Sequence, residues 1–173
     1  MDLLQRFTHG EIDAFETLVQ QFQGDIYAWI VRIVRDPGTA EDLTVETLWR
    51  VYRARHRFRP DGNFGAWARR IATNLAIDHL RRSRPVQSFP TEPGGVPQPD
   101  PLVQRETRER IQQAFRRLPA KLQVAATLAL VEELPYEEIA NSLGTSVGAV
   151  KLRVFRAVRI LRKRLSQAGI TPD

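Results

Sequence analysis

The stretch that decides the fold runs from Pro135 to Ala157 and reads PYEEIANSLGTSVGAVKLRVFRA. Its first half predicts a short helix between Pro135 and Gly144, because proline fits a first helical turn and glycine fits a left-handed cap. Thr145 or Ser146 can then cap a second, longer helix. A short helix, a glycine turn and a longer basic helix together predict a helix-turn-helix unit.

The longer helix is expected to have two faces of different character. Its inward face is a stripe of apolar residues at helical spacing, namely Val147, Val150, Val154, Ala157, Val158, Leu161 and Leu165. Its outward face consists of Lys151, Leu152, Phe155, Arg156, Arg159, Arg162 and Lys163. Apolar Leu152 and Phe155 on a basic face suit a major groove, where arginine binds guanine or phosphate and an apolar edge meets a thymine methyl. The alternative is an ordinary solvated, arginine-rich helix.

The charge of the chain is basic overall and unevenly distributed. Lysine and arginine number 26 against 20 acidic residues, for a net charge of +6. Residues 1–49 are acidic, whereas residues 50–82 carry nine arginines against two acids, and residues 151–164 carry seven basic residues and no acid. Arginine donates bidentately to phosphates and base edges. Two basic blocks and an acidic segment therefore predict two contacts with a polyanion and one with a different partner.

A proline-rich segment separates the two basic blocks. Six prolines and the pair Gly94-Gly95 fall within residues 83–104, and proline both fixes φ and lacks a backbone donor. We therefore expect a flexible linker over 83–104 and two small all-α domains, 1–82 and 105–173. No sustained alternation of period two is present, so no sheet is predicted.

Apolar periodicity predicts the remaining helices. In the first domain, helical spacing extends from Phe15 to Val34, a third helix is expected over 39–57, and a fourth begins near Phe64. In the second domain the expected helices span residues 107–118, 120–133 and 136–143.

Aromatic residues are interleaved with arginines in the basic block 50–82. Such a mixture can hold single-stranded nucleic acid by phosphate pairing and base stacking. The alternative is that the aromatics build the core, which the inward spacing favours for Phe64 and Trp67. Phe58, in contrast, lies next to a turn that contains proline and glycine. We therefore expect it to be the more exposed aromatic residue.

Several classes of protein fit the sequence poorly. The chain has no cysteine, which excludes disulfides, thiolate zinc sites and a cysteine nucleophile. The three histidines lack zinc spacing, and neither a phosphate-binding glycine motif nor a serine nucleophile elbow is present. We expect no catalytic residue, metal or cofactor. Without a long apolar run or a secretory signal, we expect a cytoplasmic protein with no membrane insertion.

At this point the motifs resemble a known family. Thr39–Arg53, Asn63–Arg82 and the opening stretch Gly10–Val19 resemble region two of bacterial sigma factors of the extracytoplasmic-function (ECF) group. The segments Pro135–Gly144 and Val147–Ala157 resemble region four of the same proteins. The resemblance covers nearly the whole chain apart from the linker.

The resemblance implies a non-enzymatic subunit that binds core RNA polymerase, through its clamp helices and flap, and directs it to promoter DNA. Region two would open the minus-ten element, region four would read the minus-thirty-five element through the outward face, and an anti-sigma factor would regulate the chain. The implied polymerase contacts are Asp42, Glu46, Trp49 and Arg50. The implied minus-ten contacts are Phe58, Asn63, Phe64, Arg69, Arg70, Asn74, Arg81 and Arg82, and the protein would associate with the nucleoid.

Three positions depart from the family pattern. Val45 stands where glutamine is usual, Leu48 where an aromatic is common, and Ala68 where a larger apolar residue is usual. We expect these changes to tune the clamp contact or the core. Glu46 and Arg50 also have the spacing of a simple i,i+4 ion pair. A repressor or activator that uses only the helix-turn-helix, and a basic ribonucleoprotein component, are the alternative functions; neither would bind core polymerase.

Overall fold

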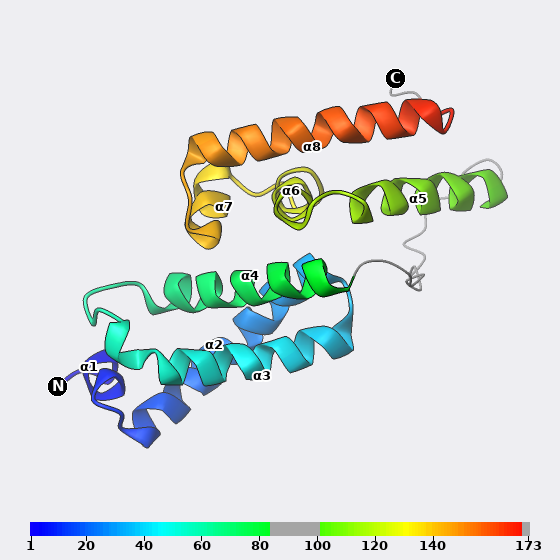
Figure 1. The fold of residues 1–173 in the computed structure, drawn as a ribbon. Coiled ribbons are helices and arrows are strands. Elements are labelled where there is room, and N and C mark those ends of the chain that lie inside the picture. The colour runs from blue at the N-terminus through cyan, green and yellow to red at the C-terminus, as the bar shows by residue number, and fades with distance from the viewer. Residues whose placement is uncertain (84–100, 171–173) are drawn as a thin grey trace.

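The computed structural model describes residues 1–83 and 101–170, and these form helices and turns without a strand. The all-α prediction is therefore confirmed for this part of the chain. We call residues 1–83 the first module and residues 101–170 the second module (Figure 1). The predicted linker falls largely on residues 84–100, which lie outside the described residues. A helix begins at Pro101, within the last residues assigned to the linker.

The first module contains four α-helices and one short 3-10 helix. Their bounds are α1 Leu3–Thr8, α2 Ile12–Val34, α3 Pro37–Arg53, the 3-10 helix Arg55–Arg57, and α4 Phe64–Arg82. The third helix is shorter than expected, because the chain tightens after Ala54, whose carbonyl accepts a hydrogen bond from the Arg57 amide at 2.8 Å. Asn63 caps α4, its side-chain oxygen accepting from the Ala66 amide at 2.9 Å.

The core of the first module is built largely from aromatic side chains. Phe7 contacts the rings of Phe15 and Phe64, at centroid distances of 6.1 and 5.5 Å. In the same cluster the ring centroids of Phe58 and Trp67 lie 5.0 Å apart. Edge-to-face and offset contacts of this kind add to the apolar burial of each ring. The cluster joins α1, α2, the 3-10 helix and the start of α4, so it fixes the loop between the last two.

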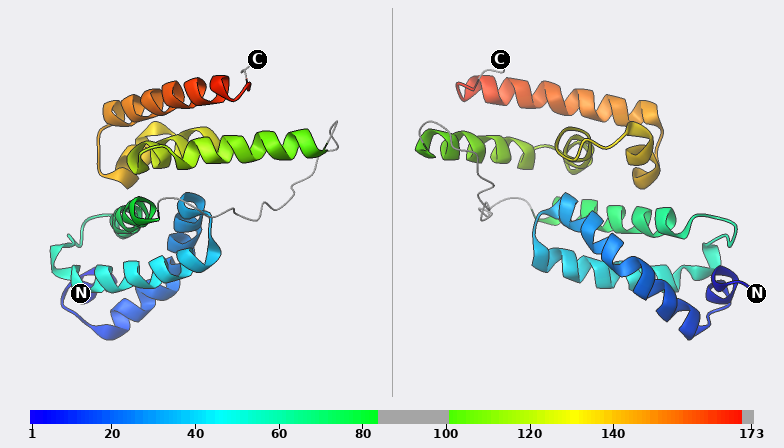
Figure 2. Two further views of the ribbon diagram at one scale, coloured as in Figure 1. Left: turned by 45° about the vertical axis from the view of Figure 1, so that its right-hand side comes forward. Right: turned by 180° about the vertical axis from the view of Figure 1, so that it is seen from behind.

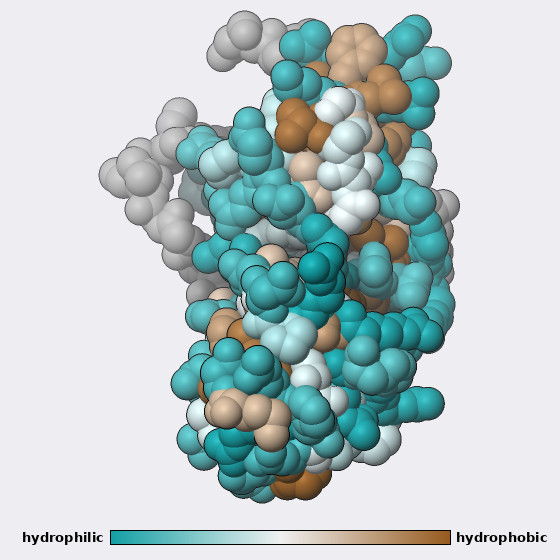
Figure 3. Space-filling model, turned by 90° about the vertical axis from the view of Figure 1, so that its left-hand side faces the viewer, coloured by the Kyte–Doolittle hydropathy of each residue, from teal (hydrophilic) through white to brown (hydrophobic). Residues whose placement is uncertain are grey.

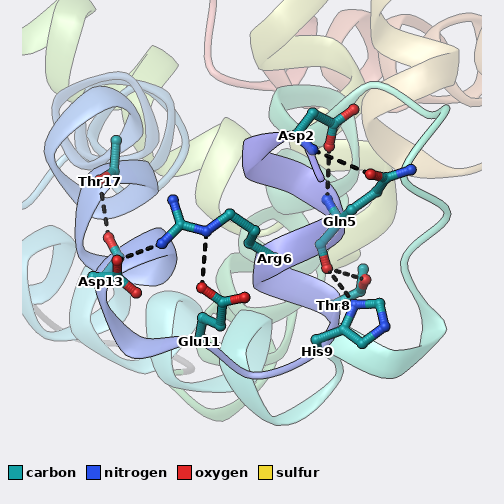
Figure 4. Close-up of polar contacts among 8 residues, drawn as sticks. All are labelled: Asp2, Gln5, Arg6, Thr8, His9, Glu11, Asp13 and Thr17. Atoms are coloured by element: carbon teal, nitrogen blue, oxygen red, sulfur yellow. Dashed lines mark hydrogen bonds and ion pairs between the residues drawn. The ribbon is translucent and has the colours of Figure 1, made fainter.

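Helix α1 is short but well anchored (Figure 4). Asp2 accepts from the backbone amide of Gln5 at 2.8 Å, and the Gln5 side chain accepts from the Asp2 amide, which makes a complete capping box. Arg6 then bonds both Glu11 and Asp13 on the following segment. These contacts hold Phe7 in place, where it is fully buried.

The second module also differs from its expected outline at two places. Its helices are α5 Pro101–Arg116, α6 Ala120–Ala126, a π-helical turn Thr127–Val131, α7 Tyr136–Leu143 and α8 Val147–Gln167. Helix α5 begins six residues before the predicted start, with Pro101 at its first position, where its missing donor costs nothing. The helix predicted over 120–133 is instead divided, because the chain widens into the π-helical turn after Ala126.

The two modules pack against each other. Helix α4 lies between the α2–α3 pair and the second module, and it contacts both α6 and α7 (Figures 1 and 2). One continuous apolar cluster contains buried residues of both modules, among them Ala72 of α4, Leu128 of the π-helical turn and Ile139 of α7. Within residues 1–83 and 101–170, no helix combines the length and apolar character needed to cross a membrane.

Candidate polymerase and DNA interfaces

Helix α3 presents an exposed face of mixed acidic and apolar character. Its opposite face is buried through Ala40, Thr44, Thr47 and Val51, which repeat at helical spacing. The exposed face, which we call the α3 face, consists of Asp42, Val45, Glu46 and Trp49. Val45 is 69% exposed and Trp49 is 56% exposed. A tryptophan and a valine open to solvent beside carboxylates are suited to a protein partner rather than to water alone.

Glu46 and Arg50 form the ion pair that their spacing predicted. The Arg50 Nε donates to a Glu46 carboxylate oxygen at 2.9 Å, with both side chains about half exposed. Asp42, by contrast, has no ion-pair partner among the described residues. The α3 face therefore offers one free carboxylate and one paired carboxylate beside its apolar centre.

The helix is held in place from its N-terminus. Asp36 accepts from both the amide and the hydroxyl of Thr39, and Pro37 occupies the first helical turn. The Thr39 hydroxyl hydrogen bond, followed by the amide bond, lowers the pKa of the Asp36 carboxyl below its ordinary value. A carboxylate that stays charged at this end also matches the positive pole of the helix.

The aromatic residues expected to line a minus-ten pocket are buried. The expectation that Phe58 is exposed is wrong: it is 6% exposed, and Phe64 is 4% exposed. Their ring centroids lie 5.7 Å apart in an edge-to-face arrangement within the aromatic core. The turn next to Phe58 does not expose its side chain, because aromatic residues of α1 and α4 bury it. These rings can support the loop 58–63 from below, whereas exposed Asn63 and Asn74 can reach a ligand.

The four arginines predicted on α4 divide into two pairs. Arg81 and Arg82 are exposed at the C-terminal end of the helix. Arg69 and Arg70 contact the second module, although Arg70 also stays exposed. Arg69 donates to Glu138 at 3.2 Å and lies over the ring of Trp29, 4.5 Å from its centroid. Arg70 donates to the backbone carbonyl of Asn141 at 2.8 Å.

The helix-turn-helix prediction matches the structure closely. Helix α7 ends at Gly144, which adopts the left-handed conformation at φ 64°, and the Ser146 side chain caps α8 by accepting from the Ala149 amide at 3.1 Å. On α8 the predicted inward stripe is buried or half-buried. The outward face is exposed along its length, at Lys151, Leu152, Phe155, Arg156, Arg159, Arg162 and Lys163.

The exposed side of α8 retains the mixed character that the sequence indicated. Leu152 is 47% exposed and Phe155 is 64% exposed. In Figure 3 apolar groups interrupt a largely hydrophilic surface near the top, where α8 lies in Figure 1. Among the residues that the structure describes, no carboxylate pairs with Lys151, Arg156, Arg159 or Arg162. Their charges are therefore available to phosphates or base edges.

Sequence reasoning missed the contacts between the modules. Glu132 pairs with Arg35 at 3.3 Å and Arg32 at 3.7 Å, across 97 positions for Arg35. No local pattern marks such a contact. The capping box at Asp2 was also missed, although an acid followed three residues later by Gln5 is a recognisable signal for a helix start.

Comparison with known families identifies both modules. Residues 18–86 match the family model Sigma-70 region 2, and residues 108–161 match Sigma-70, region 4. The chain belongs to the sigma-70 family. Relatives named as ECF sigma factors, 31–35% identical over most of the chain, place it in the ECF group. It is a sigma factor, which directs promoter-specific initiation by RNA polymerase. A repressor that used only a helix-turn-helix would not carry region 2.

Curated relatives resemble the chain over nearly its whole length. The RNA polymerase sigma-H factor of Pseudomonas aeruginosa is 35% identical, with 94% of this chain and 92% of the relative covered. The ECF RNA polymerase sigma factor SigW of Bacillus subtilis is 31% identical, with 94% of each covered. These relatives are transcription initiation factors rather than enzymes.

Among solved structures, CnrH in complex with the cytosolic domain of CnrY shares 26% sequence identity and a TM-score of 0.59. The alignment covers 95% of this chain and 96% of CnrH. The arrangement of helices described above therefore recurs in a solved structure.

Proposed function

We propose that this sigma factor divides its work between the two modules. The first module contacts the polymerase clamp through the α3 face and the minus-ten element through the loop 58–63 and α4. The second module, which starts with α5, reads the minus-thirty-five element through the outward face of α8. The observation that carries this assignment is the pairing of two exposed surfaces of opposite chemistry, acidic and apolar on α3 but basic on α8.

For the polymerase contact, the support is the exposure of Val45 and Trp49 beside Asp42 and Glu46. Buried aromatic anchors contribute most at protein interfaces, while rim charges mainly raise the association rate. Trp49 is therefore the expected anchor, with Arg50 orienting Glu46. Val45 and Leu48, which depart from the family pattern, would tune the strength of this contact.

The test is binding of variants to core polymerase. Trp49→Ala should weaken assembly by at least about 2 kcal/mol, as expected for a buried aromatic anchor. Asp42→Ala with Glu46→Ala should cost less and should lose its effect at high salt. Glu16→Ala is the matched control, because Glu16 is an exposed acid on a different helix, α2, and makes no ion pair among the described residues. Equal binding by wild type and the Trp49 variant would remove α3 from the interface.

For the minus-ten element, we assign direct contacts to Asn63, Asn74, Arg81 and Arg82, which are exposed. Phe58 and Phe64 contribute by holding the loop from the core rather than by stacking on a base. Arg70, which is exposed, adds to this contact, and Arg69 joins it when its ion pair with Glu138 is exchanged for DNA. Permanganate reactivity of promoter thymines tests these roles, and Asn74→Ala should reduce strand opening without changing thermal stability.

For the minus-thirty-five element, we propose that Lys151 and Arg156 read bases with help from Leu152 and Phe155. Arg159 and Arg162 bind the DNA backbone, because base readers cluster toward the start of a recognition helix. Arg156→Ala should cost about 1–3 kcal/mol and relax preference at one position. Arg162→Ala should weaken all sequences alike and reduce the salt slope by about one.

Run-off transcription with core polymerase on a promoter library tests the function as a whole. Wild-type protein should select a defined pair of upstream elements, and Arg156→Ala should select a broader upstream element. Transcripts that start without sequence preference, or no transcripts beyond those of core polymerase alone, would contradict the proposed function.

We also propose an anti-sigma partner and residence on the nucleoid. The solved neighbour CnrH was captured with the cytosolic domain of a second protein, CnrY. Such a partner can cover the exposed apolar residues of the α3 face, together with exposed Leu130 and Val131. Capture from native cells under non-inducing conditions should recover a protein that competes with core polymerase; recovery of polymerase alone would count against this partner.

A further inference from the structure

A pocket lies between helix α5 and the C-terminal end of α8, which run side by side in Figures 1 and 2. We call it the α5–α8 pocket, and its volume is about 270 Å³. Its polar lining consists of Arg110, Gln113 and Arg117 from α5, and of Arg164 and Gln167 from α8. Neither the α3 face nor the outward face of α8 contributes a residue to this lining.

Two of the three arginines are held in place by hydrogen bonds that cross between the helices. The Arg110 Nη1 donates to the Ala168 carbonyl oxygen of α8 at 2.9 Å. In the opposite direction, the Arg164 Nη1 donates to the Ala114 carbonyl oxygen of α5 at 3.4 Å. Each helix therefore supplies one arginine to a carbonyl of the other, which positions both guanidinium groups at the pocket.

The backbone that borders the pocket is also fixed. Helix α8 ends at Ala168 and is followed by Gly169, whose φ of 80° is left-handed. The Ile170 amide then donates back to the Leu165 carbonyl oxygen at 2.8 Å. This is the hydrogen-bond pattern of a Schellman cap, which ends a helix in a defined turn. The acceptor of Arg110 therefore has a defined position.

The positive charge of the α5–α8 pocket is not neutralised within the described part of the chain. Among residues 1–83 and 101–170, no carboxylate forms an ion pair with Arg110, Arg117 or Arg164. A guanidinium group has five N–H donors, so one carbonyl contact leaves most of them unused. Three like charges around one small pocket also repel each other, and a bound anion would relieve that repulsion.

A phosphate group suits this arrangement better than a single carboxylate. Its several oxygens can accept from more than one guanidinium group at once, and its double charge balances more of the positive charge. Pockets for drug-sized ligands have volumes of about 300–1,000 Å³, so a pocket of about 270 Å³ suits a phosphate that carries a small substituent. Arg164 lies about 200° round the helix from Arg162, and therefore faces away from the side of α8 that we assign to DNA.

We propose that the α5–α8 pocket binds the phosphate group of a small metabolite through Arg110, Arg117 and Arg164. This site is separate from the promoter contacts, and its occupation does not require the proposed function of either module. Because it bridges α5 and α8, a bound phosphate also adds a link between the first and last helices of the second module.

The test measures binding of inorganic phosphate and of pyrophosphate to the full chain by calorimetry at constant ionic strength. The variant is Arg117→Gln, because the Arg117 side chain makes no hydrogen bond or ion pair among the described residues. The matched control is Arg108→Gln, which removes an equal charge from an exposed position of α5 about 180° round the helix from Arg117. Wild-type protein should bind pyrophosphate, Arg117→Gln should bind it about tenfold more weakly, and Arg108→Gln should bind it as wild type does.

A second arm identifies the source of the phosphate. A short random DNA duplex, added to saturation, should leave pyrophosphate binding unchanged, and Arg162→Gln should weaken binding of the duplex but not of pyrophosphate. No binding by wild type, or equal weakening by Arg117→Gln and Arg108→Gln, would overturn the site. Displacement of pyrophosphate by the duplex would assign the pocket to the DNA backbone and overturn the metabolite. Failure of Arg162→Gln to alter duplex binding would instead count against the proposed DNA contact and leave this site standing.

Discussion

Both modules have a small helical core, but they build it from different side chains. The first buries rings: Phe7, Phe58 and Phe64 contact one another in one cluster, with Trp67 beside them. The second has no aromatic residue among its fully buried positions in the described chain and relies on alanine and aliphatic residues such as Ala126, Ala157 and Leu161. Rings can anchor a loop from several directions, whereas small residues let helices approach closely.

The difference also follows what each module must present. In the first module, the aromatic cluster joins α1, α2 and the start of α4, and it holds the loop between the 3-10 helix and α4. In the second, one long helix must present its outward face. Ala140 of α7 belongs to the cluster that also contains Val150 and Val154 of α8, and Ala157 of α8 belongs to the cluster with residues of α5 and α6.

The largest expected effect concerns the same residue type in the two modules. Phe64→Ala should destabilise the protein by about 3–5 kcal/mol, because it removes a ring from the centre of the aromatic cluster. Phe155→Ala removes an exposed ring from α8 and should change stability by no more than about 0.5 kcal/mol. Denaturant unfolding measures both. Similar losses from the two substitutions would remove the contrast between a buried ring and a presented one.

Glycine should behave oppositely in the two modules. Gly144→Ala should cost about 1–2 kcal/mol, because φ there is 64° and an added Cβ meets no atom closer than 4.0 Å, so the cost is backbone strain alone. Gly24→Ala lies inside α2 with open space around it and should stabilise by about 0.5–1 kcal/mol. Thermal unfolding gives the sign of each change; a stabilising Gly144 variant would contradict the left-handed cap.

The caps predict a difference in pH dependence. Ser146→Ala should destabilise by about 0.5–2 kcal/mol at every pH, because a hydroxyl cap does not titrate. Asp36 has a lowered pKa when folded, so its contribution is present above the unfolded pKa, near 4, and is lost as the pH falls through the folded value. Asp36→Asn keeps a capping acceptor and should flatten this acid loss. An acid profile identical to wild type would exclude Asp36 as its source.

The smallest expected effect is a difference in coupling energy between two surface ion pairs. In α3 the acid precedes the base, Glu46 before Arg50, whereas in α5 the order is reversed, Arg105 before Glu109. The first order suits the helix dipole better, so its coupling should approach about 0.5 kcal/mol and the second about 0.2 kcal/mol. Double-mutant cycles measure both couplings. A larger coupling in α5 would show that local packing outweighs orientation.

The sequence predicted what local rules control. Gly144, Ser146 and Asn63 have the chemistry of caps, and the apolar stripe of α8 repeats at 3.6 residues, so the helix-turn-helix and the start of α4 were predictable. The outward face of α8 followed from the same periodicity. These features depend on neighbours within one or two turns, which a sequence displays directly.

The remaining features depend on partners far along the chain. Phe58 adjoins a turn, yet rings from α1 and α4 bury it. The sequence shows Arg69 and Arg70 only as cations of a basic block, because their partners lie about 70 positions away in α7. The π-helical turn at Thr127–Val131 carries no composition that marks it. Each outcome was set by tertiary packing, which propensity and spacing do not contain.

The position of Phe7 has a consequence for how the protein is made. This side chain is fully buried, but the rings that enclose it at Phe58, Phe64 and Trp67 are translated more than fifty residues later. At a synthesis rate of about 5–20 residues per second, the first helix waits roughly 3–12 s outside the ribosome before its pocket exists. During that interval the nascent chain displays Phe7 to chaperones, and the first module can complete its core only as α4 emerges.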